Sequence, residues 1–312
     1  MNPWLVRHVT FPLFQRWIGE NVEECLQELE RTQWYSAAQL EELQWQRLKD
    51  LLAHCHAHVP YYRTMFDALG AAPDDIKDMD DFRRLPLLTK QDLHGKRCEL
   101  EAHDEPRRCV EVRSSGSTGI PTRLNISRVA NSYRWAAKAR ARRWWGWQIY
   151  DHTVMLLRVP KPRNLFDSQA VGKLLKRKFV DNVVLLNVFD LSRTRIREYY
   201  RRMRRARPKF MYALTEGAST LARFLQEEGL DGAALGLRGI SVTSEVLYPH
   251  QRETIVGAFG CPVINEYGST EVGDIACECP EGNMHLNADL LFVEFIKDGR
   301  PAAPGELATV VV

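Results

Sequence analysis

Hydrophobic residues in the first third of the chain recur at the spacing of a helix. Between residues 36 and 58 they return every three or four positions, which predicts an amphipathic helix with Leu40, Leu43, Leu48, Leu51 and Leu52 on one stripe. Ser36 suits the N-cap of this helix, and Pro60 prevents it from continuing. Thr89, shortly after Pro86, suits the cap of a second, short helix. Residues 1–107 are therefore predicted to form a helical N-terminal region.

The pattern changes at about residue 108, where short runs rich in β-branched and aromatic residues alternate with helical patterns. The helical patterns cover 127–145, 192–206, 215–229 and 247–258. The strand candidates are CVEVR, TVMLLRV, NVVLLNV, KFMYAL, GISVTS, PVINEYG, LLFVEFI and LATVVV. Several are apolar on both faces, which is typical of a buried, mainly parallel sheet. The alternation predicts an α/β architecture for residues 108–312, with helices flanking the sheet.

Apolar segments stand at both ends of the sequence. The first, MNPWLVRHVTFPLFQRWIG, is interrupted by charged residues and is too short to span a bilayer. It also lacks a signal-peptide cleavage site, so we interpret it as one face of an amphipathic helix. The last, GELATVVV, has the pattern of a strand with no turn or polar tail behind it. Because a buried strand is an uncommon last element, we expect the natural polypeptide to continue past Val312.

The composition, 45% hydrophobic and 27% charged, is that of an ordinary globular protein. A net charge of +3 excludes a polycation, and the seven cysteines show no framework spacing, which favours a reducing cytoplasm. Two arginine-rich stretches, 134–147 and 192–209, are of the kind that binds nucleic acid or an anionic membrane face. No nucleic-acid-binding motif accompanies them. We interpret both as solvated helix faces, and we expect neither a specific nucleic-acid partner nor a membrane span.

The stretch VEVRSSGSTGIPTRLN, residues 110–125, contains a loop of small and hydroxyl-bearing residues: Ser114, Ser115, Gly116, Ser117, Thr118 and Gly119. Glycines let backbone N–H groups converge on one point, and the hydroxyls add donors for phosphate oxygens. A helix expected directly after the loop would add its positive end. The loop is therefore interpreted as a polyphosphate cradle without the lysine of a nucleoside-triphosphate P-loop. A flexible surface loop is the alternative.

A second stretch, NEYGSTEVGDIACE at residues 265–278, again places Gly-Ser-Thr after a predicted strand. Glu271 follows the triplet, and a carboxylate beside bound phosphates is a natural Mg²⁺ ligand. Tyr267 offers a flat ring for a purine. An ordinary strand-to-helix turn is the alternative. Both stretches follow strands of a predicted parallel sheet, and ligands of such sheets bind at the carboxyl ends of the strands.

Together these residues resemble the adenylate-forming superfamily, most closely its phenylacetate–CoA ligase-like branch, which includes proteins named for capsule-polysaccharide synthesis. RSSGSTGIPT is similar to the superfamily's phosphate loop, and NEYGSTEVG to its adenine- and magnesium-binding motif. The branch-specific stretches VPYYRTMF, LPLLTKQDL, ISVTSEVLYPHQRETI and GCPVINEYGSTEVGDIACECPEGNMH are also present. The resemblance extends from about residue 40 to the end and implies the large N-terminal domain of such an enzyme.

The resemblance implies roles for individual residues. Residues 114–119 would hold the β- and γ-phosphates of ATP. Tyr267 would stack on the adenine, and Gly268 would be a further cofactor-binding residue. Thr270 would contact a phosphate and Glu271 the Mg²⁺ ion, so Thr270 and Glu271 are the candidate catalytic residues. Ser244 and Glu245 would lie in the wall between the acyl pocket and the adenine. For Glu245 a carboxylate at a helix N-terminus is the alternative.

The implied reaction is the activation of a carboxylic acid. Its carboxylate attacks the α-phosphate of ATP to give an acyl-adenylate and pyrophosphate, and the thiol of coenzyme A then displaces AMP. The family's ribose-binding aspartate and the lid domain with its catalytic lysine would follow Val312. We therefore expect this chain to adenylate acids slowly or not at all, and pyrophosphate release at the rate of intact ligases would refute that. A non-catalytic nucleotide- or polyanion-binding protein that keeps the fold is the alternative.

Two groups of residues suggest metal sites. Cys279 and His285 in ACECPEGNMH have the spacing of half a zinc site, and some branch members would complete it with a Cys-x-Cys pair further on. Reduced thiols with a surface histidine are the alternative. In HCHAH, His54 and His58 share a helix face, but no further ligand lies nearby in the sequence, so we favour ordinary surface histidines. The identity of the acid and the formation of a homodimer stay open.

Overall fold

The computed structural model describes residues 3–104, 109–114, 122–158 and 180–312. The chain divides into two compact units that interleave along the sequence. The sheet unit comprises Met1–Val22, Trp135–Ser269 and Asp274–Asn287. The helical unit comprises Glu23–Arg134, Thr270–Gly273 and Ala288–Val312. All regular elements of residues 3–104 are helical, whereas the predicted division at residue 107 stays a prediction.

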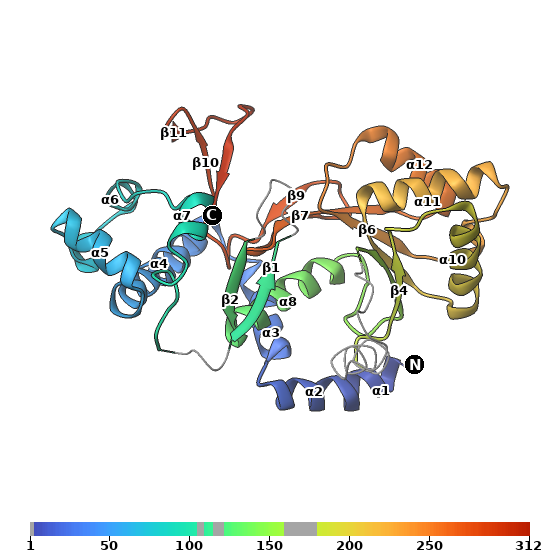
Figure 1. Cartoon of the computed structure of the whole chain (residues 1–312), viewed down its shortest axis with the longest axis horizontal. Helices are drawn as coiled ribbons and strands as arrows, with labels where there is room; N and C mark the ends of the chain where they lie inside the picture. Colours follow the sequence, from blue (N-terminus) through green and yellow to red (C-terminus); the bar gives the residue numbers. More distant parts are fainter. Residues whose placement is uncertain (1–2, 105–108, 115–121, 159–179) are drawn as a thin grey trace. The chain divides into compact units, whose positions relative to one another are not determined.

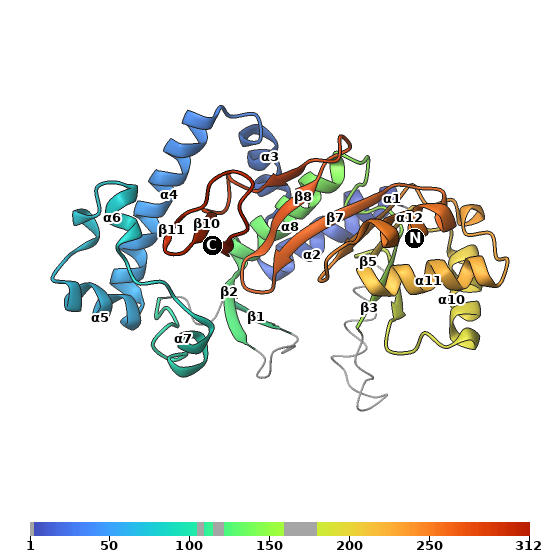
Figure 2. The ribbon, with the colours of Figure 1, turned by 90° about the horizontal axis from the view of Figure 1, so that it is seen from above.

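A seven-stranded sheet forms the centre of the sheet unit, in the order β4-β3-β5-β6-β7-β8-β9. The pairs β4/β3, β3/β5, β5/β6 and β6/β7 are parallel, and β8/β9 is antiparallel. Figure 2 shows β7 and β8 running side by side. The bounds are β3 Thr153–Leu157, β4 Val183–Asn187, β5 Phe210–Leu214, β6 Gly239–Thr243, β7 Val263–Ser269, β8 Gly273–Glu278 and β9 Met284–Leu286. The predicted α/β fold with a mainly parallel sheet is confirmed.

Three helices share one hydrophobic core with this sheet: α10 (Arg193–Ala206), α11 (Thr215–Glu227) and α12 (Pro249–Phe259). Alternate strand residues point into that core because side chains of a strand alternate between its faces; they include Val154, Leu156, Met211, Ala213, Ile240 and Val242. The intervening positions, which include Tyr212 and Ser241, belong to the opposite face and carry polar groups toward α8 (Arg128–Arg143). One face of the sheet is thus apolar, and the other face carries the polar residues that contact α8.

The helical unit contains α3 (Val22–Thr32), α4 (Ala37–His58), α5 (Pro60–Leu69), α6 (Met79–Arg83) and α7 (Lys90–Gly95). The predicted caps are confirmed. The Ser36 hydroxyl accepts the Gln39 N–H at 3.4 Å, and Thr89 caps α7 in the same way. Leu48 and Leu52 of α4 pack with Phe66 and Ile76, but Leu51 is 55% exposed and therefore does not belong to the apolar stripe.

Short strands complete the helical unit. An antiparallel pair is formed by β1 (Cys109–Arg113) and β2 (Arg123–Ser127), and a small sheet by β10 (Glu294–Lys297), β11 (Arg300–Pro301) and β12 (Thr309–Val311). All eight predicted strand segments contain a strand, whereas β2, β8, β9 and β11 were not predicted. The N-terminal segment forms α1 (Pro3–Leu5), a π-helical turn (Val6–Thr10) and α2 (Phe11–Ile18). Within the described ranges, no helix has the length and apolarity needed to cross a membrane.

Candidate functional site

The second Gly-Ser-Thr motif forms the end of β7 and the turn that follows it. The Tyr267 side chain is 47% exposed, Gly268 and Ser269 are exposed, and Thr270 and Glu271 are half-buried. The next element is strand β8, which begins at Gly273, so the alternative of a strand-to-helix turn is wrong. The turn thus presents an aromatic ring and a carboxylate at the end of β7. This strand lies between β8 and β6 in the sheet, and β6 runs parallel to it.

Arg134 on α8 holds the turn of residues 270–273. Its Nη2 donates a hydrogen bond to the carbonyl oxygen of Thr270 at 3.1 Å. Gly273 has φ of +88°, and a Cβ added there would lie 2.9 Å from Nε of Arg134. A glycine is needed here because its backbone lies in the left-handed region and the guanidinium packs against it. Nothing in the sequence singled out Arg134 for this role.

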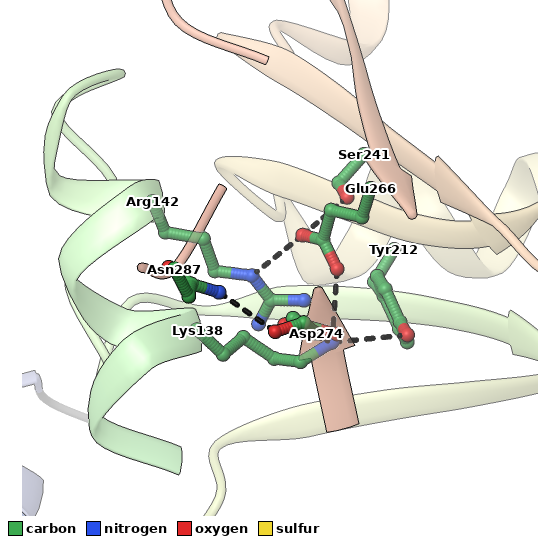
Figure 3. Close-up of polar contacts among 7 residues, drawn as sticks. All are labelled: Lys138, Arg142, Tyr212, Ser241, Glu266, Asp274 and Asn287. Atoms are coloured by element: carbon green, nitrogen blue, oxygen red, sulfur yellow. Dashed lines mark hydrogen bonds and ion pairs between the residues drawn. The ribbon is translucent and has the colours of Figure 1, made fainter. Parts of the chain in front are cut away.

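A buried cluster of charged residues lies in the sheet unit around Glu266, the residue before Tyr267 (Figure 3). Glu266 is 3% exposed. Its two carboxylate oxygens contact Lys138 Nζ at 2.9 Å and Arg142 Nε at 3.2 Å. The Ser241 hydroxyl donates to the same carboxylate at 2.5 Å. Three elements, α8, β6 and β7, are therefore joined at one carboxylate.

The cluster extends from Glu266 to β8. Lys138 Nζ lies 3.2 Å from Asp274 Oδ2 and donates to the Tyr212 hydroxyl at 3.2 Å. Asn287 donates from Nδ2 to the Asp274 carbonyl oxygen at 2.7 Å, and its Oδ1 accepts a hydrogen bond from Arg140 at 2.7 Å. The lysine thus links strands β5, β7 and β8 on the face of the sheet opposite α10–α12.

Charge pairing shifts the pKa values of this cluster. Burial opposes ionisation of Glu266, but the charges of Lys138 and Arg142 outweigh it and lower the pKa of Glu266 to about 2. Burial also disfavours the charged lysine, yet Asp274 and Glu266 raise the pKa of Lys138 well above its ordinary value. For Asp274, burial and the charge of Glu266 together prevail over Lys138 and raise the pKa. Glu266 is therefore an ion-paired carboxylate that fixes the end of β7 rather than a proton donor.

These contacts correct the interpretation of one arginine-rich stretch. Residues 134–147 were expected to form a solvated helix face, but Arg140 is 2% exposed, and the side chains of Lys138 and Arg142 are 15% and 12% exposed. The stretch 192–209 differs, because Arg193 and Arg197 of α10 are more than half exposed and pair with Glu228. On α8, Lys138 and Arg142 face buried carboxylates, which local sequence does not reveal.

Ser244 and Glu245 lie in the segment after β6. Ser244 adopts φ of +74°, a left-handed conformation that is uncommon outside glycine. The Glu245 carboxylate accepts the backbone N–H of Glu216 at 2.9 Å and lies 3.5 Å from Arg158. Since Glu216 is in the first turn of α11, Glu245 has the contact of a carboxylate at a helix N-terminus. This contact agrees with the alternative for Glu245, and its role in binding stays a prediction.

Of the first loop, only Ser114 lies within the described residues; Ser115, Gly116, Ser117, Thr118 and Gly119 lie outside them. The Ser114 N–H donates to the Thr122 carbonyl oxygen at 2.9 Å, and the Ser114 hydroxyl accepts the Thr122 N–H at 2.8 Å. The loop thus connects the paired strands β1 and β2. The expectation that a helix follows the loop directly is wrong, because β2 stands between the loop and α8.

Cys279 and His285 flank the turn between β8 and β9. Cys279 is half-buried, and the exposed His285 is the strand partner of Cys277 and lies edge-on to Trp144 at 5.6 Å. Cys277 is buried, and burial raises the pKa of its thiol well above the ordinary value. Among the described residues, no group of three or more metal-binding side chains includes Cys279 or His285. The zinc site stays a prediction.

Comparison with known proteins finds several phenylacetate-coenzyme A ligases and a protein named CapK from Staphylococcus aureus. No family model matches the chain. A phenylacetate-coenzyme A ligase of Escherichia coli is 43% identical over 89 residues, which cover 28% of this chain and 20% of the ligase. A phenylacetate-coenzyme A ligase of Thermus thermophilus is 24% identical over 293 residues, covering 87% of this chain and 61% of the ligase. The chain thus spans less than two thirds of these curated relatives.

The solved structures agree in fold. The crystal structure of a 2-hydroxyisobutyryl-CoA ligase in the postadenylation state superposes with a TM-score of 0.71 and 19% identity, covering 88% of this chain and 59% of that one. The chain therefore has the fold of that ligase. The sequence similarities to phenylacetate-coenzyme A ligases agree with the resemblance that the motifs indicated.

Proposed function

We propose that this chain supplies the nucleotide- and acid-binding part of an ATP-dependent acid–CoA ligase. A carboxylate attacks the α-phosphate of ATP, pyrophosphate leaves, and an acyl-adenylate remains. The thiol of coenzyme A then attacks the acyl carbon, AMP leaves with its electron pair, and a thioester forms. The similarity to proteins named phenylacetate-coenzyme A ligase supports this class of reaction. The identity of the acid is open.

The observation that carries the proposal is the Tyr267–Glu271 turn at the end of β7. Tyr267 presents an exposed ring on which a purine can stack. The Glu271 carboxylate forms no ion pair with any of the described residues, although it is half-buried. It is therefore available to bind a cation, and Mg²⁺ prefers carboxylate and phosphate oxygens. Thr270 beside it can donate its hydroxyl to a phosphate oxygen.

Charge explains why the site needs these groups. The acid and the triphosphate are both anions, so their approach must be stabilised by cations and hydrogen-bond donors that are already in place. Glu271 would hold Mg²⁺ when the nucleotide binds, and that ion would neutralise the phosphates. Residues 114–119 would donate N–H and hydroxyl groups to the same phosphates. The buried Glu266 cluster and Arg134 keep the ends of the turn in position.

Titration with ATP, with and without Mg²⁺, tests the proposal. The chain should bind ATP more tightly when Mg²⁺ is present, and Glu271→Gln should remove that dependence because the amide no longer attracts the cation. Glu281→Gln is a matched control, since Glu281 is an exposed glutamate of the β8–β9 connection. It should behave like the wild type. Equal Mg²⁺ dependence in Glu271→Gln would contradict the role of Glu271, and absence of ATP binding would contradict the proposal.

The same titration separates the alternative class. A polyanion-binding protein would bind inorganic triphosphate as tightly as ATP and would not lose affinity when the purine is removed. The proposed ligase should prefer ATP, because Tyr267 contributes stacking of about 1–3 kcal/mol. Tyr267→Ala should therefore weaken ATP about tenfold or more and leave triphosphate binding unchanged. Pyrophosphate release measured over a panel of aryl and short hydroxy acids would then identify the acid.

A further inference from the structure

A cluster of metal-binding side chains lies in the helical unit, apart from the motif residues. His54 and His58 are four residues apart in the last turns of α4, and their rings are 4.8 Å apart. Asp104, distant in sequence, brings its Oδ2 to 3.8 Å from His54 Nδ1. One ligand atom of each residue lies within 4.8 Å of the others. Asp104 is therefore a third possible metal ligand, which the sequence alone did not indicate and which the tertiary structure brings beside the two histidines.

Backbone hydrogen bonds hold the segment that carries Asp104 against the end of α4. The His103 N–H donates to the His58 carbonyl oxygen at 3.1 Å, and the Tyr61 N–H donates to the Glu99 carbonyl oxygen at 3.0 Å. The position of Asp104 beside the histidines is thus fixed by main-chain contacts. It does not depend on a flexible side chain reaching across solvent.

The surroundings suit a cation. The C-terminal end of a helix carries partial negative charge, and α4, with 22 residues, ends at His58. His54 and Asp104 also line a hollow of about 590 Å³, which leaves room for water ligands. Glu101 lines the same hollow, but its carboxylate contacts Arg97 at 3.4 Å and Asn125 at 3.1 Å. Among the described residues, the ligand atoms that lie close together here come from two imidazoles and one carboxylate.

This donor set matches a transition metal ion better than Mg²⁺ or Ca²⁺, because imidazole nitrogen binds Zn²⁺ well and hard cations prefer oxygen. In a tetrahedral site, zinc–ligand bonds of about 2.1 Å place two ligand atoms about 3.4 Å apart. The ligand atoms lie within 4.8 Å of one another, so rotations of side chains that reach solvent must bring the most distant pair about 1.4 Å closer.

We propose that His54, His58 and Asp104 bind one Zn²⁺ ion, with water completing a tetrahedral site, and that the ion fastens the 99–104 segment to the end of α4. The site is separate from the proposed ligase function and does not depend on it. Its role is structural, since the ion would link two parts of the chain that otherwise meet through a few hydrogen bonds.

Zinc stoichiometry, measured by competition with a chromophoric chelator, tests the proposal. The double variant His54→Ala/His58→Ala should lose one equivalent of bound zinc relative to the wild type. Differences between variants matter here, because the seven cysteines can bind zinc elsewhere. His56→Ala is the matched control: it removes a histidine from the same helix whose ring packs edge-on against Phe66 at 5.5 Å. His56→Ala should therefore bind as much zinc as the wild type. Circular dichroism should show that each variant is folded.

Asp104→Asn tests the third ligand. In the wild type, zinc should slow hydrogen exchange of residues 99–104, and in Asp104→Asn this protection should disappear while the weaker pair of histidines remains. An unchanged zinc stoichiometry in the folded double variant would overturn the proposal. Full protection of the segment by zinc in Asp104→Asn would also overturn it, because the carboxylate would then not be a ligand.

Discussion

The buried Glu266 cluster makes a quantitative prediction about stability. Glu266→Gln keeps the size and shape of the side chain but removes the charge that pairs with Lys138 and Arg142. Both cations would remain buried, and among the described residues Asp274 would be the carboxylate left beside them. Removing one member of a buried ion pair typically costs about 3–5 kcal/mol, because the partner charge is left without compensation.

The lowered pKa of Glu266 gives a second, independent value for the stability that this ion pair contributes. Although burial opposes its ionisation, Lys138 and Arg142 lower the pKa from 4.5 to about 2. That difference corresponds to about 3 kcal/mol of stabilisation at neutral pH. Loss of Glu266 also removes its repulsion of Asp274, which offsets part of the cost. We therefore expect Glu266→Gln to lower the free energy of unfolding by about 2–4 kcal/mol at pH 7.

The sign of the pH dependence follows from the lowered pKa. A carboxyl group whose pKa is lower in the folded state contributes its full stability above its unfolded pKa, here 4.5, and loses it as the pH falls toward about 2. The stability difference between wild type and Glu266→Gln should therefore narrow by about 2 kcal/mol between pH 7 and pH 3. A packing defect, by contrast, would give a difference independent of pH.

Urea unfolding, followed by tryptophan fluorescence, measures both quantities. Trp147 is a suitable reporter because it is 2% exposed and the Arg142 guanidinium lies 4.1 Å from its ring. Glu253→Gln, an exposed glutamate of α12, is the control and should change stability by less than about 0.5 kcal/mol. A Glu266→Gln protein as stable as this control at pH 7 would refute the reasoning, and so would a large loss that does not diminish with acid.

Two further substitutions test the positioning of the site and its core. Gly273→Ala should lower the free energy of unfolding by about 1–3 kcal/mol, because it adds left-handed backbone strain and a clash with Arg134. Urea unfolding should show a smaller loss for the control Gly282→Ala, where φ is also positive but no atom lies within 4 Å of the added Cβ. Trp147→Ala should cost about 3–5 kcal/mol in the same measurement, because its ring stacks on Phe210 at 4.6 Å and is almost fully buried; a loss below 1 kcal/mol would contradict this packing.

The positions of the regular elements were determined largely by local sequence. Helices α8, α10, α11 and α12 begin and end within about two residues of their predicted bounds, because apolar periodicity and caps act over one or two turns. The strand β2 was not predicted, although RLNIS alternates polar and apolar residues, because it is only five residues long and lies beside a loop rich in glycine and serine. Its identity as a strand depends on pairing with β1, which is a contact between separate segments.

The sequence by itself also predicted which two motifs form the candidate site, from glycine, hydroxyl and carboxylate residues at fixed spacing, and the roles of these residues stay predictions. Only the tertiary structure decided which charged side chains are buried and which residues they pair with. Lys138 and Arg142 have the local pattern of an exposed basic helix, yet they pair with Glu266 in the interior. Asp104 likewise gains its histidine neighbours only through the folded chain. The physical reason is that burial and pairing set the energy of a charge, and both depend on residues far away along the chain.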